Sequence, residues 1–246
     1  YCNFYDKNLI PKELCIHMNA ILGNGLFSDD IENPYQFWLK FIVVKGMLNK
    51  IDYAASAGID TLELEPQNAS KYVENAFKIK KEKDKNITFP NKVQEFMGKE
   101  ENKDKNIIVV ASTGIGKTEG ALLWTGDSKT FYTLPIKVSI NAIYKRIWDE
   151  NYYDKNKFTF LHSDAKSIMR KDEEIDDYQL KYIETRHLIY PLTICTVDQL
   201  FYFVFKSLGT EKYAATLKYS KVIIDEIQSY TPDIISFLIF GLKVVN

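Results

Sequence analysis

The clearest chemical pattern in the chain is a glycine-rich octet, Ala111-Ser112-Thr113-Gly114-Ile115-Gly116-Lys117-Thr118. It matches the phosphate-binding loop G-x-x-x-x-G-K-[ST], except that Ala111 stands in place of the first glycine. Glycines let backbone N–H groups curl around a phosphate, and a helix that begins there directs its positive end at the same anion. The octet therefore predicts a site for the phosphates of ATP.

Two side chains of the octet have specific expected roles. The Lys117 ammonium is a compact charge that reaches the β- and γ-phosphates, and the Thr118 hydroxyl can ligate Mg²⁺. The alternative is a glycine-containing turn between a strand and a helix, with an incidental Lys-Thr pair. Further contacts to ATP are expected from the loop residues Ser112, Thr113, Gly114, Ile115 and Gly116.

A second pattern is an apolar run, Val222–Ile224, that ends in two carboxylates, Asp225 and Glu226. A P-loop ATPase needs one carboxylate at a strand end to hold Mg²⁺, which suits Asp225. It needs another group to orient or deprotonate the attacking water, which suits Glu226. A strand ending in Asp-Glu is often an ordinary solvent-facing end, but after a P-loop in the same domain it predicts catalysis.

Alternating strand and helix patterns are expected to position these residues. Such alternation gives βαβ units and a parallel sheet with helices on both faces, and ligands bind beyond the carboxyl ends of its strands. The predicted class is therefore α/β. Strands are expected at Ile107–Ala111, Thr130–Leu134, Lys157–Leu161, Leu192–Thr196 and Val222–Asp225, and helices at 117–124, 136–148, 172–187, 198–207 and 232–244.

The residues before the P-loop have a different composition. Apolar residues at three- and four-residue steps predict one helix over 34–57, which Gly58 is expected to end. Lysine- and glutamate-rich runs follow, so 63–86 is expected to be a linker or an exposed helix.

Composition limits the classes of partner and location. With 32 basic and 33 acidic residues the formal net charge is −1, so a nucleic acid would be held by a local groove and not by bulk charge. The cysteines Cys2, Cys15 and Cys195 are far apart, which favours a reducing cytoplasm over a disulfide framework. No apolar run is long enough to predict a membrane span.

These patterns together resemble the superfamily 2 helicases. Ala111–Thr118 is similar to their motif I, and Asp225-Glu226-Ile227-Gln228 is similar to their motif II. Gln94, which follows Phe89-Pro90, is placed like the adenine-reading glutamine of their Q motif; an exposed helix glutamine is the alternative. The resemblance implies a RecA-like domain whose contacts to ATP include Gln94, Asp225 and Gln228.

Other segments resemble one family in particular, the CRISPR-associated helicase-nucleases of type I interference systems. The segments are Leu161-His162-Ser163, Thr196–Leu200 and Asp225–Tyr230. Thr133-Leu134-Pro135 resembles helicase motif Ia, so Pro135 and Thr196 are expected to hold phosphates of a tracked strand. Gln228 stands where many relatives carry a histidine.

In that family a metal-dependent HD nuclease domain precedes the helicase. Leu48–Ser56 resembles the helix that carries its last metal ligand, which assigns Asp52 as a ligand of a divalent transition metal. An aspartate on the polar face of the helix, or one with a structural hydrogen bond, is the alternative. The expected layout is an all-α HD remnant over 1–62, a linker over 63–86 and the first RecA-like helicase domain over 87–246.

The resemblance implies an ATP-dependent DNA helicase coupled to a nuclease in antiviral defence, with single-stranded DNA and a CRISPR effector complex as partners. The chain starts at Tyr1 and stops soon after motif II, so we expect a piece of a longer protein that alone binds ATP without unwinding DNA. A restriction-type translocase and a P-loop module without motor activity are the alternatives.

Overall fold

The computed structural model describes residues 34–172, 175–205 and 209–245. Of these residues, 42–245 belong to one compact unit, and this unit contains the sheet. Among the described residues, no helix combines the length and the apolar character that a bilayer crossing requires. The helix expected over 34–57 is confirmed as α2 (Pro34–Ser56).

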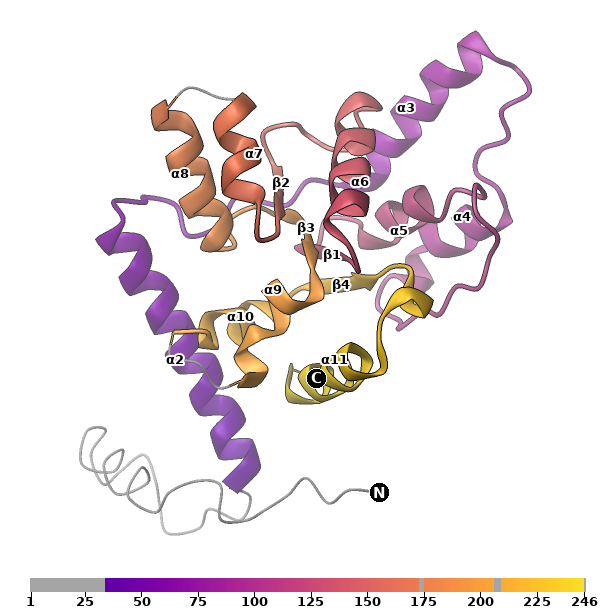
Figure 1. Cartoon of the computed structure of the whole chain (residues 1–246). Helices are drawn as coiled ribbons and strands as arrows, with labels where there is room; N and C mark the ends of the chain where they lie inside the picture. Colours follow the sequence, from indigo (N-terminus) through magenta and orange to yellow (C-terminus); the bar gives the residue numbers. More distant parts are fainter. Residues whose placement is uncertain (1–33, 173–174, 206–208, 246) are drawn as a thin grey trace, which may run out of the picture. The chain divides into compact units, whose positions relative to one another are not determined.

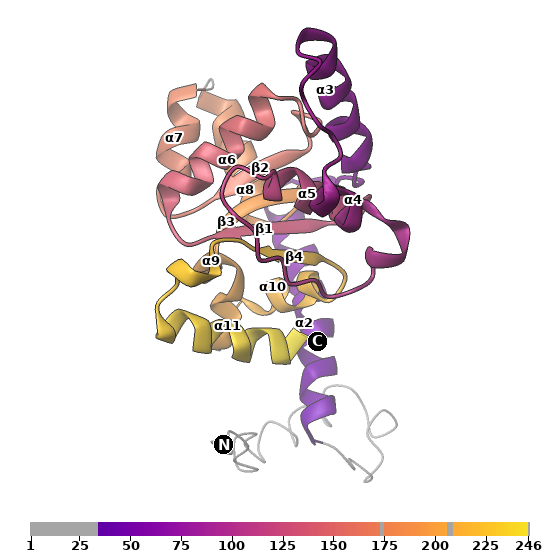
Figure 2. The same ribbon diagram turned by 90° about the vertical axis from the view of Figure 1, so that its right-hand side faces the viewer.

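A sheet of four parallel strands forms the centre of this unit (Figures 1 and 2). The strand order is β2-β3-β1-β4, so β1 pairs with β3 on one side and with β4 on the other. All four carboxyl ends therefore meet at one edge. The strands are β1 (Thr130–Leu134), β2 (Phe158–Leu161), β3 (Leu192–Thr196) and β4 (Lys221–Ile224).

The strand register separates the two faces of the sheet. Tyr132 pairs with Ile194 and Ile223, and Phe160 pairs with Ile194, so these side chains share one face. They belong to the main apolar core, which also includes Ile140 and Ile147 of α6 (Lys137–Asp149) and Leu122 of α5 (Lys117–Thr125).

The opposite face has its own cover. Here the Thr159 and Thr185 hydroxyls are 2.8 Å apart, which joins β2 to α8 (Ile175–Arg186). In both views α6 and α7 lie on one side of the strands while α9, α10 and α11 lie on the other. The predicted α/β class is therefore confirmed.

The remaining elements are α3 (Ala69–Lys83), α4 (Lys92–Gly98), α7 (Ala165–Asp172), α9 (Val197–Phe201), α10 (Glu211–Leu217) and α11 (Pro232–Val245), with short 3-10 turns at Glu100–Asn102, Tyr202–Phe205 and Ile227–Ser229.

The segment expected to be a linker or an exposed helix contains α3. Its Ala69, Val73 and Ala76 are buried, and α3 packs against α5 within the main core. The helix was one of the two expected forms, but its apolar face is covered. The domain boundaries at 62 and 86 stay predictions.

One expected strand is absent. Ile107–Ala111 alternates as a strand would, with Val109 packed against the core, but it forms no ladder with the described strands. Ile108 and Val110 are 94% and 95% exposed. The strand prediction at 107–111 is therefore wrong for this structure, because β-branched composition supplies a preference for extended backbone but not a hydrogen-bonding partner.

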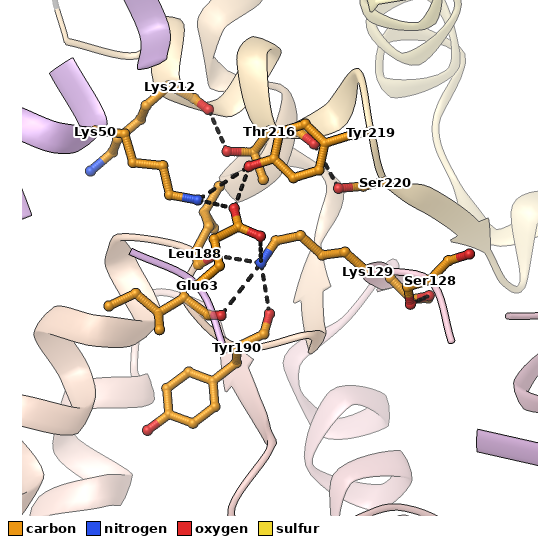
Figure 3. Close-up of polar contacts among 12 residues, drawn as sticks. Lys50, Glu63, Ser128, Lys129, Leu188, Tyr190, Lys212, Thr216, Tyr219 and Ser220 are labelled. Carbon is orange, nitrogen blue, oxygen red and sulfur yellow. Dashed lines mark hydrogen bonds and ion pairs between the residues drawn. The ribbon is translucent and has the colours of Figure 1, made fainter. Parts of the chain in front are cut away.

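At the amino-terminal end of β1, a buried polar cluster connects the sheet to α2 (Figure 3). The Glu63 carboxylate forms ion pairs with Lys50 of α2 and, at 3.4 Å, with Lys129. Lys129 also donates to the carbonyls of Leu188 at 2.6 Å and Tyr190 at 3.1 Å. Both lysines are nearly inaccessible, at 2% and 4% exposure.

Burial in this cluster works against the charged lysines. Desolvation lowers the pKa of Lys129 to about 8, although the nearby Glu63 carboxylate favours the charged ammonium form and acts to raise it. The pKa of Glu63 is lowered, because the attraction of Lys129 and Lys50 outweighs the opposing effect of burial. Glu63 is thus the charge that makes two buried ammonium groups tolerable.

The change Glu63→Gln is expected to destabilise the fold by about 2–3 kcal/mol. That is less than the roughly 3–5 kcal/mol for breaking a fully buried pair, since part of Glu63 remains in water. Urea unfolding measures the difference. Glu65→Gln, an exposed neighbour, is the matched control and should change stability little. Equal effects of the two changes would contradict the role given to Glu63.

Candidate functional site

The glycine-rich loop leads directly into α5. Gly114 and Gly116 have positive φ values of 82° and 83°, and Gly116 is the residue before the first helical turn. The side chains from Ser112 to Ile115 are exposed, while Thr118 is 6% exposed. The Lys117 ammonium donates to the Ala111 carbonyl at 3.1 Å, across the mouth of the loop. This geometry can receive a phosphate at a helix N-terminus.

The start of α4 supports the loop from one side. The Gln94 amide is 3% exposed; its oxygen accepts from the Asn91 N–H at 3.0 Å and its nitrogen donates to the Gly116 carbonyl at 3.4 Å. Asn91 donates to the Ile115 carbonyl at 2.7 Å. Gln94 is therefore buried against the loop, unlike the exposed helix glutamine considered as its alternative. Its contact with adenine stays a prediction.

The position of the Gln94 side chain, as well as the φ angle, favours glycine at 116. A Cβ added there would lie 2.2 Å from the Gln94 amide nitrogen, whereas a Cβ on Gly114 would meet nothing within 4 Å. The Gln94 side chain thus occupies the space that any larger residue at 116 would need.

The two motif II carboxylates lie just beyond β4. The Asp225 N–H donates to the Thr133 carbonyl at 3.0 Å, which extends the β1–β4 ladder by one bond. One Asp225 oxygen accepts from the Glu226 N–H at 2.9 Å, and the other accepts from the Tyr132 hydroxyl at 2.6 Å. Glu226 has a left-handed φ of 53°, a conformation that costs energy for a residue with a Cβ. Gln228 is exposed and donates to the Glu226 carboxylate.

The P-loop and motif II meet at Tyr132. Burial raises the pKa of Tyr132 well above its usual value, Asp225 acts in the same direction, and the nearby Thr118 hydroxyl acts in the opposite one. The Thr118 hydroxyl and the Asp225 carboxylate therefore lie beside the same phenol. Hydroxyl and carboxylate oxygens are the ligands that Mg²⁺ takes together with nucleotide phosphates, so these residues fit that ion.

The sequence patterns did not identify an ion pair next to the loop that joins a buried carboxylate to an exposed arginine. Glu119 of α5 is 1% exposed and pairs with Arg146 of α6. Its second carboxylate oxygen is buried and has no hydrogen-bond partner within the described residues. Glu119 directly follows Lys117-Thr118, which could have singled it out, but its partner is visible only once α5 and α6 are packed.

The residues predicted to hold nucleic acid share the carboxyl edge of the sheet. Leu134 pairs with Thr196, and Pro135 follows directly, so Pro135 and Thr196 lie at the ends of neighbouring strands. His162 at the end of β2 is 2% exposed, and its ring nitrogens contact Asn141 at 3.1 Å and the Asp164 N–H at 3.2 Å. His162 is thus held by hydrogen bonds within the fold.

Asp52 is an exposed residue of α2. The described residues contain no group of three or more His, Cys, Asp or Glu side chains that could hold a metal ion. The part of the chain that the structure describes therefore does not assemble an HD metal centre. The role of Asp52 as one ligand stays a prediction.

The sequence model of the DEAD/DEAH box helicases matches residues 91–237, a span that contains the loop, both nucleic-acid candidates and motif II. The chain belongs to this helicase family. The resemblance to superfamily 2 helicases is thus confirmed, and motifs I and II both lie inside the matched helicase domain.

Among the helicases, the chain is similar in sequence to two CRISPR-associated nuclease/helicases. The chain is 30% identical over 237 residues to the CRISPR-associated nuclease/helicase Cas3 of Methanothermobacter thermautotrophicus, covering 89% of this chain and 27% of the relative. It is 27% identical over 143 residues to a putative Cas3 of Methanocaldococcus jannaschii, covering 52% and 19%. The chain thus spans about a quarter or less of these relatives, and the predicted resemblance to the CRISPR-associated helicase-nucleases is confirmed.

Solved structures support the fold of this helicase domain. The crystal structure of T. fusca Cas3 with ATP has a TM-score of 0.54 and 20% identity, over 78% of this chain and 22% of that one. The structure with ADP has a TM-score of 0.53 and 19% identity, over 77% and 22%. The RecA-like expectation is confirmed at the level of fold.

Gly116→Ala is expected to destabilise the nucleotide-free protein more than Gly114→Ala does. Both place a Cβ on a left-handed residue, but only the first displaces Gln94, so the difference should be about 1–3 kcal/mol. Chemical denaturation of both variants gives the comparison. In a Gln94→Ala background the two substitutions should become similar; an unchanged difference there would contradict the steric cause.

Proposed function

We propose that this chain is the ATP- and Mg²⁺-binding lobe of an ATP-dependent DNA helicase coupled to an HD nuclease in CRISPR antiviral defence. The observation that carries the proposal is the meeting of Thr118 and Asp225 beside Tyr132. It brings a phosphate-binding loop and a motif II carboxylate, far apart in sequence, to one place at the carboxyl edge of the sheet. The similarity to Cas3 nuclease/helicases supplies the biological setting.

Each residue of the site has a role in this proposal. The backbone from Ser112 to Gly116 surrounds the phosphates, and Lys117 leaves the Ala111 carbonyl to bind them. Thr118 and Asp225 hold Mg²⁺, which supplies charge stabilisation to the phosphoryl group when bound. Glu226 accepts the proton of the attacking water. Gln94 contacts adenine while it supports Gly116, and Gln228 keeps Glu226 oriented through the hydrogen bond already present.

The proposed DNA contacts lie at the same carboxyl edge of the sheet. Single-stranded DNA passes over the strand ends, where Pro135 and Thr196 contact its phosphates. In the whole protein, Asp52 contributes one ligand to the nuclease metal. The proposed partner that delivers the DNA is a CRISPR effector complex, and the CRISPR-associated name of the relatives supplies only that general setting. The cytoplasm is the proposed compartment.

Lys117→Ala should weaken the binding of Mg·ATP about tenfold or more and leave the fold intact, because the Lys117 ammonium donates to a carbonyl of the loop itself, that of Ala111, and not to a core element. Isothermal titration calorimetry of both proteins measures the affinities. Lys145→Ala, which removes an exposed lysine of α6 outside the loop, is the control. Equal affinities of the wild-type and Lys117→Ala proteins would refute the phosphate site.

Glu226→Gln in the full-length protein should preserve ATP binding and lower the DNA-stimulated turnover roughly a hundredfold or more, since the amide cannot accept the proton. Steady-state ATPase assays with and without single-stranded DNA measure this. A wild-type protein that binds ATP but never responds to DNA would favour a nucleotide-binding module over a motor. Unchanged turnover in the variant would remove Glu226 from its role as base.

A further inference from the structure

The Asp225 carboxylate is fixed by two hydrogen bonds, one to each oxygen. The first comes from the Glu226 backbone N–H at 2.9 Å and persists whatever side chain stands at 226. The second comes from the Tyr132 hydroxyl at 2.6 Å and is a side-chain contact from the neighbouring strand. A substitution at 132 can therefore remove this second hydrogen bond and leave the Asp225 side chain unchanged.

We propose that Tyr132 is a positioning residue for magnesium, which holds the Asp225 carboxylate in the orientation that coordinates the ion together with Thr118. This inference rests on the proposed function, since it assumes that Asp225 and Thr118 hold Mg²⁺. It adds a residue from β1 to a site otherwise built from the P-loop and motif II.

The sheet register explains why a tyrosine at 132 reaches Asp225. Tyr132 lies opposite Ile223, and Asp225 is two residues beyond Ile223, so all three side chains leave the same face of the sheet. The phenol spans the two-residue offset along the strand. A residue at 131 or 133 would point to the opposite face.

Packing makes the phenol a rigid donor. Tyr132 is 1% exposed and belongs to the main core, on a strand that is paired on both sides. A tyrosine has only two side-chain torsions, and the surrounding core restricts both. The hydroxyl therefore keeps its position beside the Asp225 carboxylate, whether or not the ion is bound.

The hydrogen bond leaves room for coordination. An ionised carboxylate has about four lone-pair positions, so one bond from Tyr132 and one from the Glu226 N–H leave the others for the ion or its waters. Partners of this kind orient metal ligands, and their removal typically costs about 10–100-fold in metal affinity. Tyr132 therefore acts on the ion through Asp225.

The test is Tyr132→Phe in the full-length protein, which deletes one oxygen and keeps the ring. We expect the Mg²⁺ concentration for half-maximal binding of a fluorescent ADP to rise about tenfold or more. Affinity for ADP measured in EDTA, and the melting temperature without nucleotide, should stay near the wild-type values. Tyr153→Phe, which removes a buried phenol hydroxyl that accepts from the Gln67 N–H, is the matched control and should leave the Mg²⁺ dependence unchanged.

A double-mutant cycle with Asp225→Asn separates positioning from general damage. If Tyr132 acts through the carboxylate, Tyr132→Phe should have no further effect on Mg²⁺ dependence once Asp225 is an amide. Additive effects, or an Mg²⁺ dependence that Tyr132→Phe leaves at the wild-type value, would overturn the proposal. A wild-type protein that binds ADP equally with Mg²⁺ and with EDTA would instead contradict the assignment of Thr118 and Asp225, and thus the proposed function itself.

Discussion

Parallel pairing of β1 with β3 on one side and β4 on the other is the constraint on which the site depends. Because β1 is in register with both neighbours, Leu134 lies opposite Thr196 and the Thr133 carbonyl receives the Asp225 N–H. One strand thereby fixes the distance between the DNA-binding candidates and the motif II carboxylates. The same strand supplies Tyr132, so a shift of register by one residue would turn the phenol to the other face.

The two ends of β1 carry different kinds of polar contact. Near its carboxyl end, the Tyr132 hydroxyl donates to the partly exposed carboxylate of Asp225, the proposed magnesium ligand. Before its amino end Lys129 is enclosed by carbonyls and by Glu63, and Glu63 in turn pairs with Lys50 of α2. The helix that carries Asp52 is thus attached to the strand that orders the ATPase residues. A replacement of Lys50 or Glu63 would weaken that attachment without touching either set of catalytic candidates.

Sequence alone predicted the parts of the fold that local patterns determine. The P-loop, α2 and four of five strands follow from residue types at fixed spacing, and so does the edge at which Asp225, Pro135 and Thr196 lie. The strand expected at Ile107–Ala111 is absent because a strand needs a hydrogen-bonding partner, and the local sequence pattern does not reveal whether one is present. Tyr132 was assigned only to a strand, because its contact with Asp225 depends on the β1–β4 register. The buried side of α3 was missed because its Ala69, Val73 and Ala76 are small and lie among lysines.

The free edge of β4 also affects how these residues behave in solution. Within the described residues β4 pairs only with β1, and the side chains of Ile108 and Val110 are exposed before the P-loop. Unpaired backbone groups beside exposed β-branched side chains form a template for strand addition from another molecule. A sample of these residues alone should therefore self-associate as its concentration rises, and its light scattering should fall when a charged residue replaces Ile108 or Val110.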